Sequence, residues 1–509
     1  MSEQSAAPIN DRREIFGWTM YDWANSAFST TVAVVFLGPY LSELAKIAAD
    51  AQGLLNLGNV PIRFDSLFPF TVSLSVLLQA SFLPVLGALA DYSNQRKRLM
   101  TIFAMVGSIA TIMMFFVTAE TFWLGSLLFI IANLAFGGSV VFYNAYLPDI
   151  ASEDQRDRVS AAGFGMGYLG GGLLLLLNLI LFIFSEDLGL SGGMVARISL
   201  ASAGVWWLVF SFFSFSRLRD QHNSRPLPEG ENYLTIGFSQ LGHLLELPTQ
   251  VVAALLLPIL LIPVLFIIGL PAELAVLPAA GPIVVLIIFI WRKSKTLPEA
   301  MKYLVAYLLY NDGIQTVITV AAVFASLELG MSSTNLILVI LMIQFTAFGG
   351  AYLFSFLASR MGTKNAIQLS LVIWSGTTIY AYFGMRNFNT TSLGITQAEL
   401  EFWLLGFVIA LVLGGSQALS RSLFSQMIPA EQEAEFFSFY EVSERGTSWM
   451  GPALFGLVNQ QFASLRAGIL SIIVFFILGL ILLPLVNVNK AKEEGKSASP
   501  EFVATPAGD

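Results

Sequence analysis

A carboxylate and three further polar side chains share one helix face at the start of the first long apolar stretch. The segment reads YDWANSAFST, and Asp22, Asn25, Ser26 and Ser29 follow the i, i+3, i+4, i+7 spacing of a single face. A charge at the centre of a membrane helix costs about 2.5–3.5 kcal/mol, so it usually faces a bundle interior or a water-filled path. We expect this face, with Tyr21 beside it, to line a path for a solute or a proton. The alternative is a carboxylate at the membrane surface that the helix dipole favours.

The pattern recurs in the second half of the chain, in YLLYNDGIQTV. There Asp312 and Gln315 repeat the spacing of Asp22 and Asn25. Asp312 lies deep inside its apolar span, where a surface location no longer explains a carboxylate. We therefore predict that Asp312 and Gln315 belong to the same path.

The densest group of charges in an apolar setting is in FYEVSERGTSWMGP. Glu441, Glu444, Arg445 and Ser448 fall on one helix face. Two carboxylates near one guanidinium titrate as a coupled set, which suits a proton-coupled transporter. A structural pair between Glu441 and Arg445 at i, i+4 is the alternative. Arg445 could also bind a substrate carboxylate in a bidentate fork.

Further polar side chains occur on two other apolar segments. Asn144, in FYNAYLPDIAS, and Gln417 are candidates for hydrogen bonds to a solute, and hydrogen bonds between helices explain them equally well. Arg421 follows Gln417 by one turn and could instead extend toward the membrane surface. Gly163, Gly167 and Gly171 form a ladder of small residues that we interpret as helix packing.

The composition requires a membrane helix bundle to position these residues. The chain has 509 residues, of which 56% are hydrophobic and 12% charged, against about 25% charged in soluble domains. Uncharged runs of about 20 residues match the length of a membrane-spanning helix, and helix satisfies every backbone group in lipid. We predict fourteen spans near 17–42, 66–90, 99–118, 121–147, 159–184, 196–216, 251–270, 275–291, 303–327, 334–358, 365–384, 401–427, 436–462 and 467–486.

Lysine and arginine residues set the expected orientation. With the N-terminus inside, inner segments hold 20 of the 26 Lys and Arg residues and outer segments hold five. Both termini are thus expected in the cytoplasm, and internal repeats predict a transporter of two halves. The expected divisions are a cytoplasmic N-terminus (1–16), a six-helix bundle (17–216), a linker (217–302) with an inserted transmembrane hairpin (251–291), a second six-helix bundle (303–486) and a disordered cytoplasmic tail (487–509).

Several classes of function are excluded or disfavoured. The chain has no Cys and only two His, both in the linker, so we expect no metal site and no cofactor. The net charge of −8 is spread over loops, and no basic stripe suggests nucleic acid. The polar N-terminus indicates no cleavable signal peptide. An aspartyl-type membrane hydrolase is disfavoured because no GxGD follows the Tyr-Asp pair, and a non-transporting receptor or scaffold is a further alternative.

Two motifs make the chain resemble a known family. GALADYSNQRKR is similar to the loop signature of the major facilitator superfamily, in which Gly87, Asp91, Arg96, Lys97 and Arg98 would form a cytoplasmic gate. GWTMYDWANSAF, FYNAYLPDIAS with GFGMGYLGGG, and YLLYNDGIQTV resemble the vacuole-effluxer branch of that superfamily. The resemblance covers about residues 15–216 and 300–486. It implies the major-facilitator fold and, from fungal relatives, export of amino acids.

Together these observations predict a secondary transporter of a small solute, not an enzyme. We expect it to work by alternating access and to be proton-coupled, or coupled to another ion. We expect a monomer, multi-pass in the cell (inner or plasma) membrane, or in the vacuolar membrane of a eukaryote. Because no spanning segment holds His or Cys, the carboxylates Asp22, Asp312, Glu441 and Glu444 are the candidate proton carriers.

Overall fold

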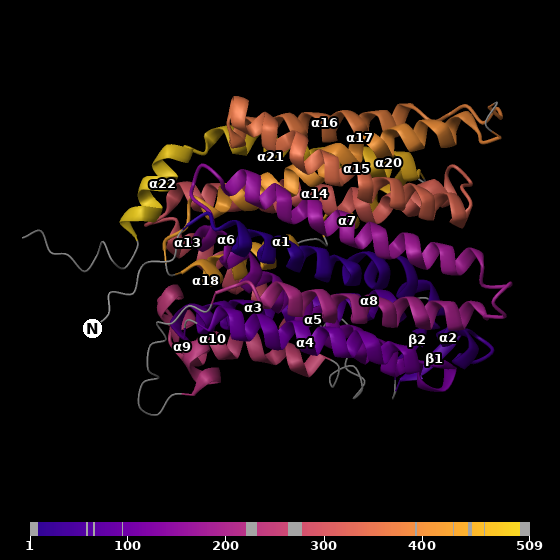
Figure 1. The fold of residues 1–509 in the computed structure, drawn as a ribbon, viewed down its shortest axis with the longest axis horizontal. Coiled ribbons are helices and arrows are strands. Elements are labelled where there is room, and N and C mark those ends of the chain that lie inside the picture. Colours follow the sequence, from indigo (N-terminus) through magenta and orange to yellow (C-terminus); the bar gives the residue numbers. More distant parts are fainter. Residues whose placement is uncertain are drawn as a thin grey trace, which may run out of the picture.

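The protein is described by a computed structural model in which long helices run side by side along one axis (Figure 1). It describes residues 9–57, 60–64, 67–93, 95–219, 232–262, 277–391, 394–430, 432–445, 450–462 and 464–498. Ten helices in these ranges are long and apolar enough to cross a membrane. The all-helical class is as predicted, whereas the count of fourteen spans is not reproduced.

The helices before residue 220 form the N-terminal group. Its members are α1 (Arg12–Ala27), which continues through the π-helix η1 (Phe28–Phe36) into α2 (Leu37–Ala48), then α3 (Leu67–Ser93), α4 (Arg96–Met113), α5 (Phe122–Ala145), the short α6 (Leu147–Ile150), α7 (Arg156–Ile183) and α8 (Gly192–Phe215). The side chain of Asp11 begins α1 by accepting from the Arg13 N–H. A small antiparallel hairpin, β1 (Leu54–Leu57) and β2 (Val60–Arg63), separates α2 from α3.

The helices after residue 297 form the C-terminal group. They are α14 (Pro298–Leu327), α15 (Ser333–Met361), α16 (Thr363–Phe383), α17 (Gln397–Ser425), α18 (Glu433–Arg445), α19 (Met450–Phe462), α20 (Leu465–Ser471) and α21 (Ile473–Leu482). Gly362, with a φ of 87°, ends α15 and allows the chain to turn directly into α16. The span predicted for 436–462 is described as two helices, α18 and α19.

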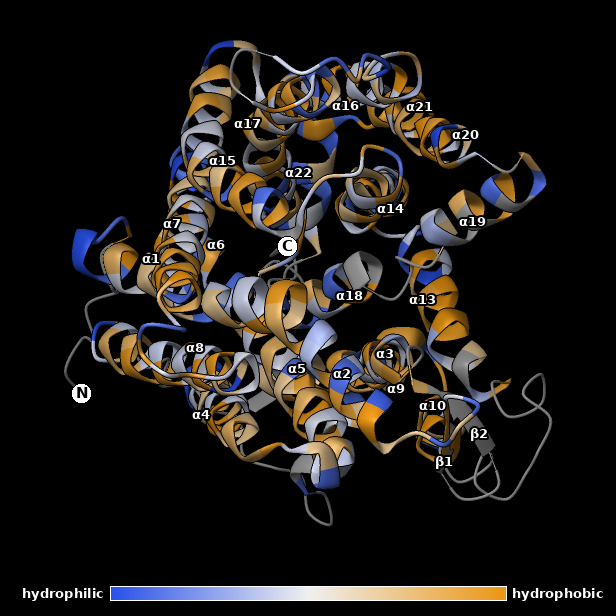
Figure 2. Cartoon of the chain, turned by 90° about the vertical axis from the view of Figure 1, so that its right-hand side faces the viewer, coloured by the Kyte–Doolittle hydropathy of each residue, from blue (hydrophilic) through white to orange (hydrophobic). Residues whose placement is uncertain are grey.

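The two groups face each other across the centre of the molecule (Figure 2). Figure 1 distinguishes two ends along the helix axis. The end with the start of α1, the end of α3 and the start of α18 is called here the terminus end. The opposite end, which carries β1 and β2, is called the β end.

The described part of the segment between the groups contains three α-helices and two short 3-10 helices. α9 (Tyr233–Leu245) bends by 105° into α10 (Thr249–Leu256), and α13 (Ala280–Lys293) leads back toward α14. α13 has 14 residues, fewer than the roughly 20 that span a bilayer. The described helices thus do not establish two full spans in the predicted hairpin at 251–291, and the part between its arms lies outside the described residues.

Part of the C-terminal tail predicted to be disordered is helical, and residues 499–509 of that tail lie outside the described residues. Residues Val488–Ser497 form α22, whose N-cap Asn487 accepts from the Lys490 N–H. Ala491 and Gly495 are buried, and a Cβ at Gly495 would lie 2.8 Å from the Met427 carbonyl oxygen. The prediction from polarity was wrong for this segment because a helix with one small, buried face docks by close backbone approach rather than by bulky apolar side chains.

Candidate functional site

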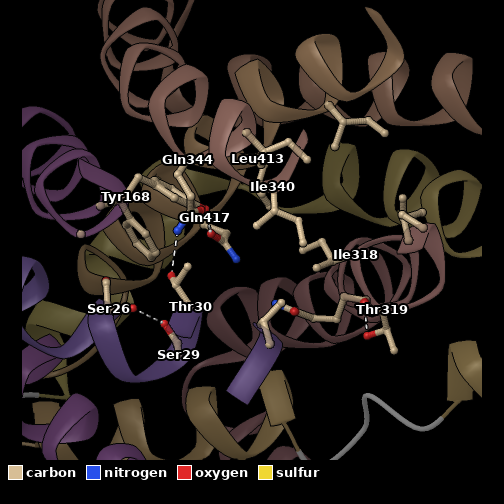
Figure 3. Close-up of a pocket in the computed structure, with 18 of the residues that line it drawn as sticks. Ser26, Ser29, Thr30, Tyr168, Ile318, Thr319, Ile340, Gln344, Leu413 and Gln417 are labelled. Carbon is tan, nitrogen blue, oxygen red and sulfur yellow. Dashed lines mark hydrogen bonds between the residues drawn. The ribbon is translucent and has the colours of Figure 1, made fainter. Parts of the chain in front are cut away.

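A cavity of about 540 Å³ lies between the two groups of helices. The N-terminal group contributes lining residues from α1, η1, α3, α5 and α7, and the C-terminal group contributes them from α14, α15, α17 and α18. Figure 3 shows part of the lining, with side chains of both groups turned toward one space. The cavity therefore depends on how the two groups are placed.

One part of the cavity is charged and combines both groups. The Tyr143 hydroxyl donates to Asp22 Oδ2 at 2.8 Å, and Arg421 Nη1 of α17 lies 3.5 Å from the same oxygen. Arg421 also donates to Asn144 Oδ1 at 3.1 Å and to Ser160 Oγ at 2.9 Å. The Arg421 side chain is 3% exposed, so it is buried in the bundle and does not extend to the membrane surface.

A second carboxylate joins this cluster through Asn144. The Asn144 amide donates to Glu441 Oε1 of α18 at 2.8 Å while its carbonyl oxygen accepts from Arg421. Asp22, Arg421 and Glu441 all line the cavity. These three formal charges sum to −1, which favours an ammonium group or a proton as an additional partner.

Aromatic rings surround the guanidinium. The Arg421 carbon Cζ lies 4.1 Å from the centroid of the Phe164 ring and 4.8 Å from that of Trp18. Trp18 stacks on Tyr143, with ring centroids 4.3 Å apart. Rings at these distances stabilise a cation through their quadrupoles and hold its plane in place.

The glycine ladder of α7 makes room for this cluster. A Cβ at Gly163 would lie 2.6 Å from the Tyr143 hydroxyl and 2.9 Å from Arg421 Nη2. A Cβ at Gly167 would lie 2.7 Å from Ser26 Oγ, and one at Gly171 would lie 2.7 Å from Thr30 Oγ1. The packing interpretation is thus incomplete, because Gly163 also borders the charged cluster.

The remaining wall of the cavity is mostly apolar with a few amides and hydroxyls. Gln344 donates to Thr30 Oγ1 at 2.7 Å, and the Tyr168 hydroxyl donates to Gln417 Oε1 at 2.5 Å, each pair joining the two groups. The apolar lining includes Val34, Leu336, Val339, Ile340, Phe402, Leu405, Ile409 and Leu413. The cavity thus combines a charged part with a large apolar part.

The predicted path residues fall into three sets. Asp22, Asn25, Asn144, Gln315, Gln417 and Glu441 line the cavity. Tyr21 and Asp312 are buried and are not among the lining residues, since Tyr21 packs against Tyr143 and Phe215. The side chains of Glu444 and Arg445, and all of Ser448, lie outside the described residues.

Sequence reasoning left out several residues that the structure brings to the site. For Arg421 the sequence leaves hydrogen bonding to a solute or to another helix, and extension to the surface, as alternatives, and it gives no reason to single out Ser160, Tyr168 or Gln344. A signal for Arg421 was its place in the apolar segment 401–427, because a buried cation needs an anion. Which anion it meets depends on the contact between the groups, which no local spacing reveals.

At the terminus end a network that we call the gate joins the two groups: Asp91, Arg96, Asp149, Glu433 and the first turn of α18. Arg96 contacts Asp91 at 2.7 Å, Asp149 at 2.9 Å and Glu433 at 2.5 Å. Asp91 accepts from the backbone N–H of Ala434 at 3.1 Å and of Glu435 at 2.7 Å. A carboxylate at a helix N-terminus satisfies free N–H groups and complements the helix dipole.

The other predicted gate residues differ in their roles. A Cβ at Gly87 would lie 2.5 Å from the Ala434 carbonyl oxygen, so glycine lets α3 and α18 touch. Lys97 donates to the Leu218 carbonyl oxygen at 2.8 Å, and Arg98 donates to Gln95 Oε1 at 3.3 Å. Both of these hydrogen bonds join residues of the N-terminal group and so do not connect the two groups.

Comparison with known proteins gives a consistent assignment. Residues 10–264 and 283–496 match the family described as vacuole effluxer Atg22 like. The uncharacterized MFS-type transporter YxiO of Bacillus subtilis (strain 168) is 27% identical over 473 residues, which cover 92% of this chain and 94% of that protein. Autophagy-related protein 22-1 of Penicillium rubens is 22% identical over 604 residues, covering 98% and 93%.

Solved structures share the fold. The MFS proton:xylose symporter XylE bound to 6-bromo-6-deoxy-D-glucose has a TM-score of 0.57 at 15% identity, covering 93% of this chain and 95% of that chain. A bacterial homologue of the iron transporter ferroportin in the outward-facing state has a TM-score of 0.56 at 13% identity, covering 93% and 98%. The family match also extends beyond the ranges expected from the motifs. This multi-pass membrane protein with the MFS fold therefore belongs to the vacuole effluxer Atg22-like family of MFS-type transporters.

Proposed function

We propose that the protein is a secondary transporter that exports a small solute, of the amino-acid class, by alternating access. The observation that carries this proposal is the charged cluster in the cavity, to which both groups contribute. Asp22 belongs to the N-terminal group and Arg421 to the C-terminal group, with 3.5 Å between Oδ2 and Nη1. A solute held by such a cluster would contact both groups at once, as rocking around a fixed site requires.

The chemistry of the cluster is suited to a zwitterion. Arg421 would hold a carboxylate by its forked donors, while Asp22 or Glu441 would hold an ammonium group. The description of the family, vacuole effluxer Atg22 like, supports efflux as the direction. The cavity gives no comparable support for the two alternative functions, a non-transporting receptor and a membrane hydrolase.

We further propose the topology in which this cycle runs. The distribution of Lys and Arg favours both termini in the cytoplasm. On that orientation the terminus end is cytoplasmic, and the cavity with its closed gate belongs to an outward-facing state. The two groups would act as six-helix halves of a monomer in the cell membrane, with residues 217–302 as an insert-bearing linker.

We also propose that transport of the solute is coupled to protons. Asp22 and Glu441 line the cavity, and Asp312 is buried without being among the lining residues, so a carboxylate is available in the cavity wall and another outside it. One of them would carry a proton in each cycle, since burial favours the neutral form unless a cation is close.

The test begins with purified protein and a thermal-shift screen against amino acids and other metabolites, because a ligand that binds the folded state raises the unfolding temperature. Hits then go to liposomes containing the protein and a pH-sensitive dye. Solute flux that moves protons and is absent from empty liposomes supports the proposal. A protein that binds a solute but never moves it across the membrane would instead be a receptor.

A further inference from the structure

The helices between the two groups lie against the gate. α9 packs closely on α3, since a Cβ at Gly237 would lie 2.8 Å from the Val85 carbonyl oxygen. α13 crosses α10 still more closely, because a Cβ at Gly281 would lie 1.8 Å from the Leu255 carbonyl oxygen. Figure 2 shows α9, α10 and α13 beside α3 and α18. These three helices are thus fixed to the N-terminal group.

α13 also contacts the C-terminal group through one buried ring. Phe289 is 0% exposed and stacks on Phe439 of α18, with centroids 3.7 Å apart and an interplanar angle of 6°. It meets Phe436 of α18 edge to face at 5.4 Å. By contrast, Ile287 and Trp291 on the same helix are 59% and 57% exposed. One face of α13 is therefore docked on α18, while the other faces away.

The end of α13 brings a cation near the carboxylates at the start of α18. Lys293 Nζ lies 5.9 Å from the centroid of the Phe436 ring. Burial lowers the pKa of Lys293, and the nearby carboxylates of Glu435 and Glu246 oppose that change. The backbone N–H of Glu435 is one of the two that Asp91 accepts from. Lys293 thus stands next to a gate in which Asp91, Asp149 and Glu433 outnumber Arg96.

We infer that α9, α10 and α13 act as a clamp that holds the gate closed, with Phe289 as the docking residue and Lys293 as its electrostatic support. The inference rests on the alternating access of the proposed function. Opening the terminus end requires α18 to leave α3, because Asp91 is bonded to the first turn of α18. A ring wedged from α13 onto α18 adds a contact that this movement must break, and α13 itself stays tied to α3 through α10 and α9.

The test measures the gate directly and needs no substrate. The chain contains no Cys, so Arg98→Cys on α4 and Ser359→Cys on α15 supply two unique spin-label sites. Both are exposed, at the terminus end, one in each group. Phe289→Ala should raise the population with the longer distance by about 2- to 10-fold, the range expected from losing one aromatic pair. Lys293→Gln should shift it in the same direction by less.

Matched variants make the outcome decisive. Ile287→Ala on the exposed face of α13 should leave the distances as in the parent, and Phe289→Leu keeps an apolar side chain if the alanine variant does not fold. Asp91→Asn is the positive control for opening. Distances that move in Asp91→Asn but stay unchanged in both Phe289 variants overturn the clamp. Distances that no variant moves count against rocking itself, and so remove the proposed cycle together with the clamp.

Discussion

Asp22 and Asp312 occupy corresponding places in the first helix of each group, yet their surroundings differ. Asp22 lines the cavity, accepts from Tyr143 at 2.8 Å and lies 3.5 Å from Arg421 of the other group. Asp312 is 1% exposed, and in the described part of the chain no cation pairs with its carboxylate, which only the backbone N–H of Gly451 approaches. It faces α19, where a Cβ at Gly451 would lie 3.1 Å from Oδ2.

The different surroundings suggest different roles for Asp22 and Asp312, although the two residues have the same spacing to a following amide in the sequence. A carboxylate paired with a guanidinium at a cavity can exchange that partner for a ligand. An unpaired carboxylate in apolar surroundings is costly, and a proton removes the cost. Asp22 is thus suited to solute binding and Asp312 to proton carriage.

We expect the largest effect from replacing Asp22, the carboxylate that pairs with Arg421. Asp22→Asn leaves Arg421 buried without its carboxylate, and removing one partner of a buried pair costs about 3–5 kcal/mol. We expect solute flux in liposomes to fall by about 100-fold or more, with no thermal stabilisation by the solute.

The double variant Asp22→Asn/Arg421→Gln serves as its control. It removes both charges, so its folded state should be more stable than that of Asp22→Asn, while flux remains absent. Flux at the parent level in Asp22→Asn would show that Asp22 is a structural residue.

The second prediction concerns Asp312, the carboxylate that has no cation partner in the described residues. Asp312→Asn keeps the volume of the side chain but cannot take up and release a proton. We expect proton movement in dye-loaded liposomes to disappear while exchange of solute for solute continues. Flux of both solute and protons at the parent level would assign coupling elsewhere and favour sodium coupling or facilitated transport.

Sequence reasoning succeeded where a residue's surroundings follow from its own helix. The polar face Asp22, Asn25, Ser26 and Ser29 was read from spacing, and all four line the cavity. It failed where the surroundings come from another helix. Arg421 receives its role from Tyr143, Asn144 and Ser160, and the exclusion of Asp312 from the lining depends on how α14 and α19 pack.

The fold shows the same division. Apolar length predicted most of the long helices, because lipid requires helical backbone whatever the neighbours are. The docked helix α22 was not foreseen, since its contact depends on Gly495 meeting the backbone at Met427. The span predicted for 436–462 is described as α18 and α19, and residues 446–449 between them lie outside the described residues.

A third prediction concerns the terminus end, where the two groups differ in the polar residue near the end of their second long helix. Asp91 lies two residues before the end of α3. Ser359, two residues before the end of α15, has no carboxylate and donates to the Phe356 carbonyl oxygen within its own helix. Asp91→Asn should weaken the gate by about 1–2 kcal/mol, as loss of a helix cap does, and raise the inward-open population by about 5- to 30-fold.

Labelling checks this prediction in the cysteine-free chain. A cysteine at position 25 should react faster with a reagent added from the cytoplasmic side when Asp91 is Asn. Ser359→Ala is the matched variant in the other group and should leave the rate unchanged. An unchanged rate in Asp91→Asn would leave this carboxylate with a role in topology alone.

The smallest effect is expected at Glu153, the residue through which α22 contacts the N-terminal group by charge in the described residues. Lys492 and Lys496 of α22 both pair with Glu153, which lies between α6 and α7 of the N-terminal group. On its other side α22 packs against the backbone at Met427, just after α17, and contacts Glu299 of α14. Glu153 is 41% exposed, and a surface pair contributes at most about 1 kcal/mol. Glu153→Gln should therefore raise the open population of the spin-label pair by less than about 5-fold.

The pH dependence of this effect has a fixed sign. The hydrogen bond from Lys492 lowers the pKa of Glu153, so its contribution is present above the usual glutamate value of about 4.3 and disappears as the pH falls through the lowered pKa. The parent and Glu153→Gln should thus differ at pH 7 and converge as the pH falls through the lowered pKa of Glu153. Glu186→Gln, in the loop between α7 and α8, should match the parent throughout. Equal distances for parent and Glu153→Gln at pH 7 would mean that α22 docks on the C-terminal group without restraining the N-terminal one, and the asymmetry between the groups would then rest on Asp91 and the α3–α18 contact.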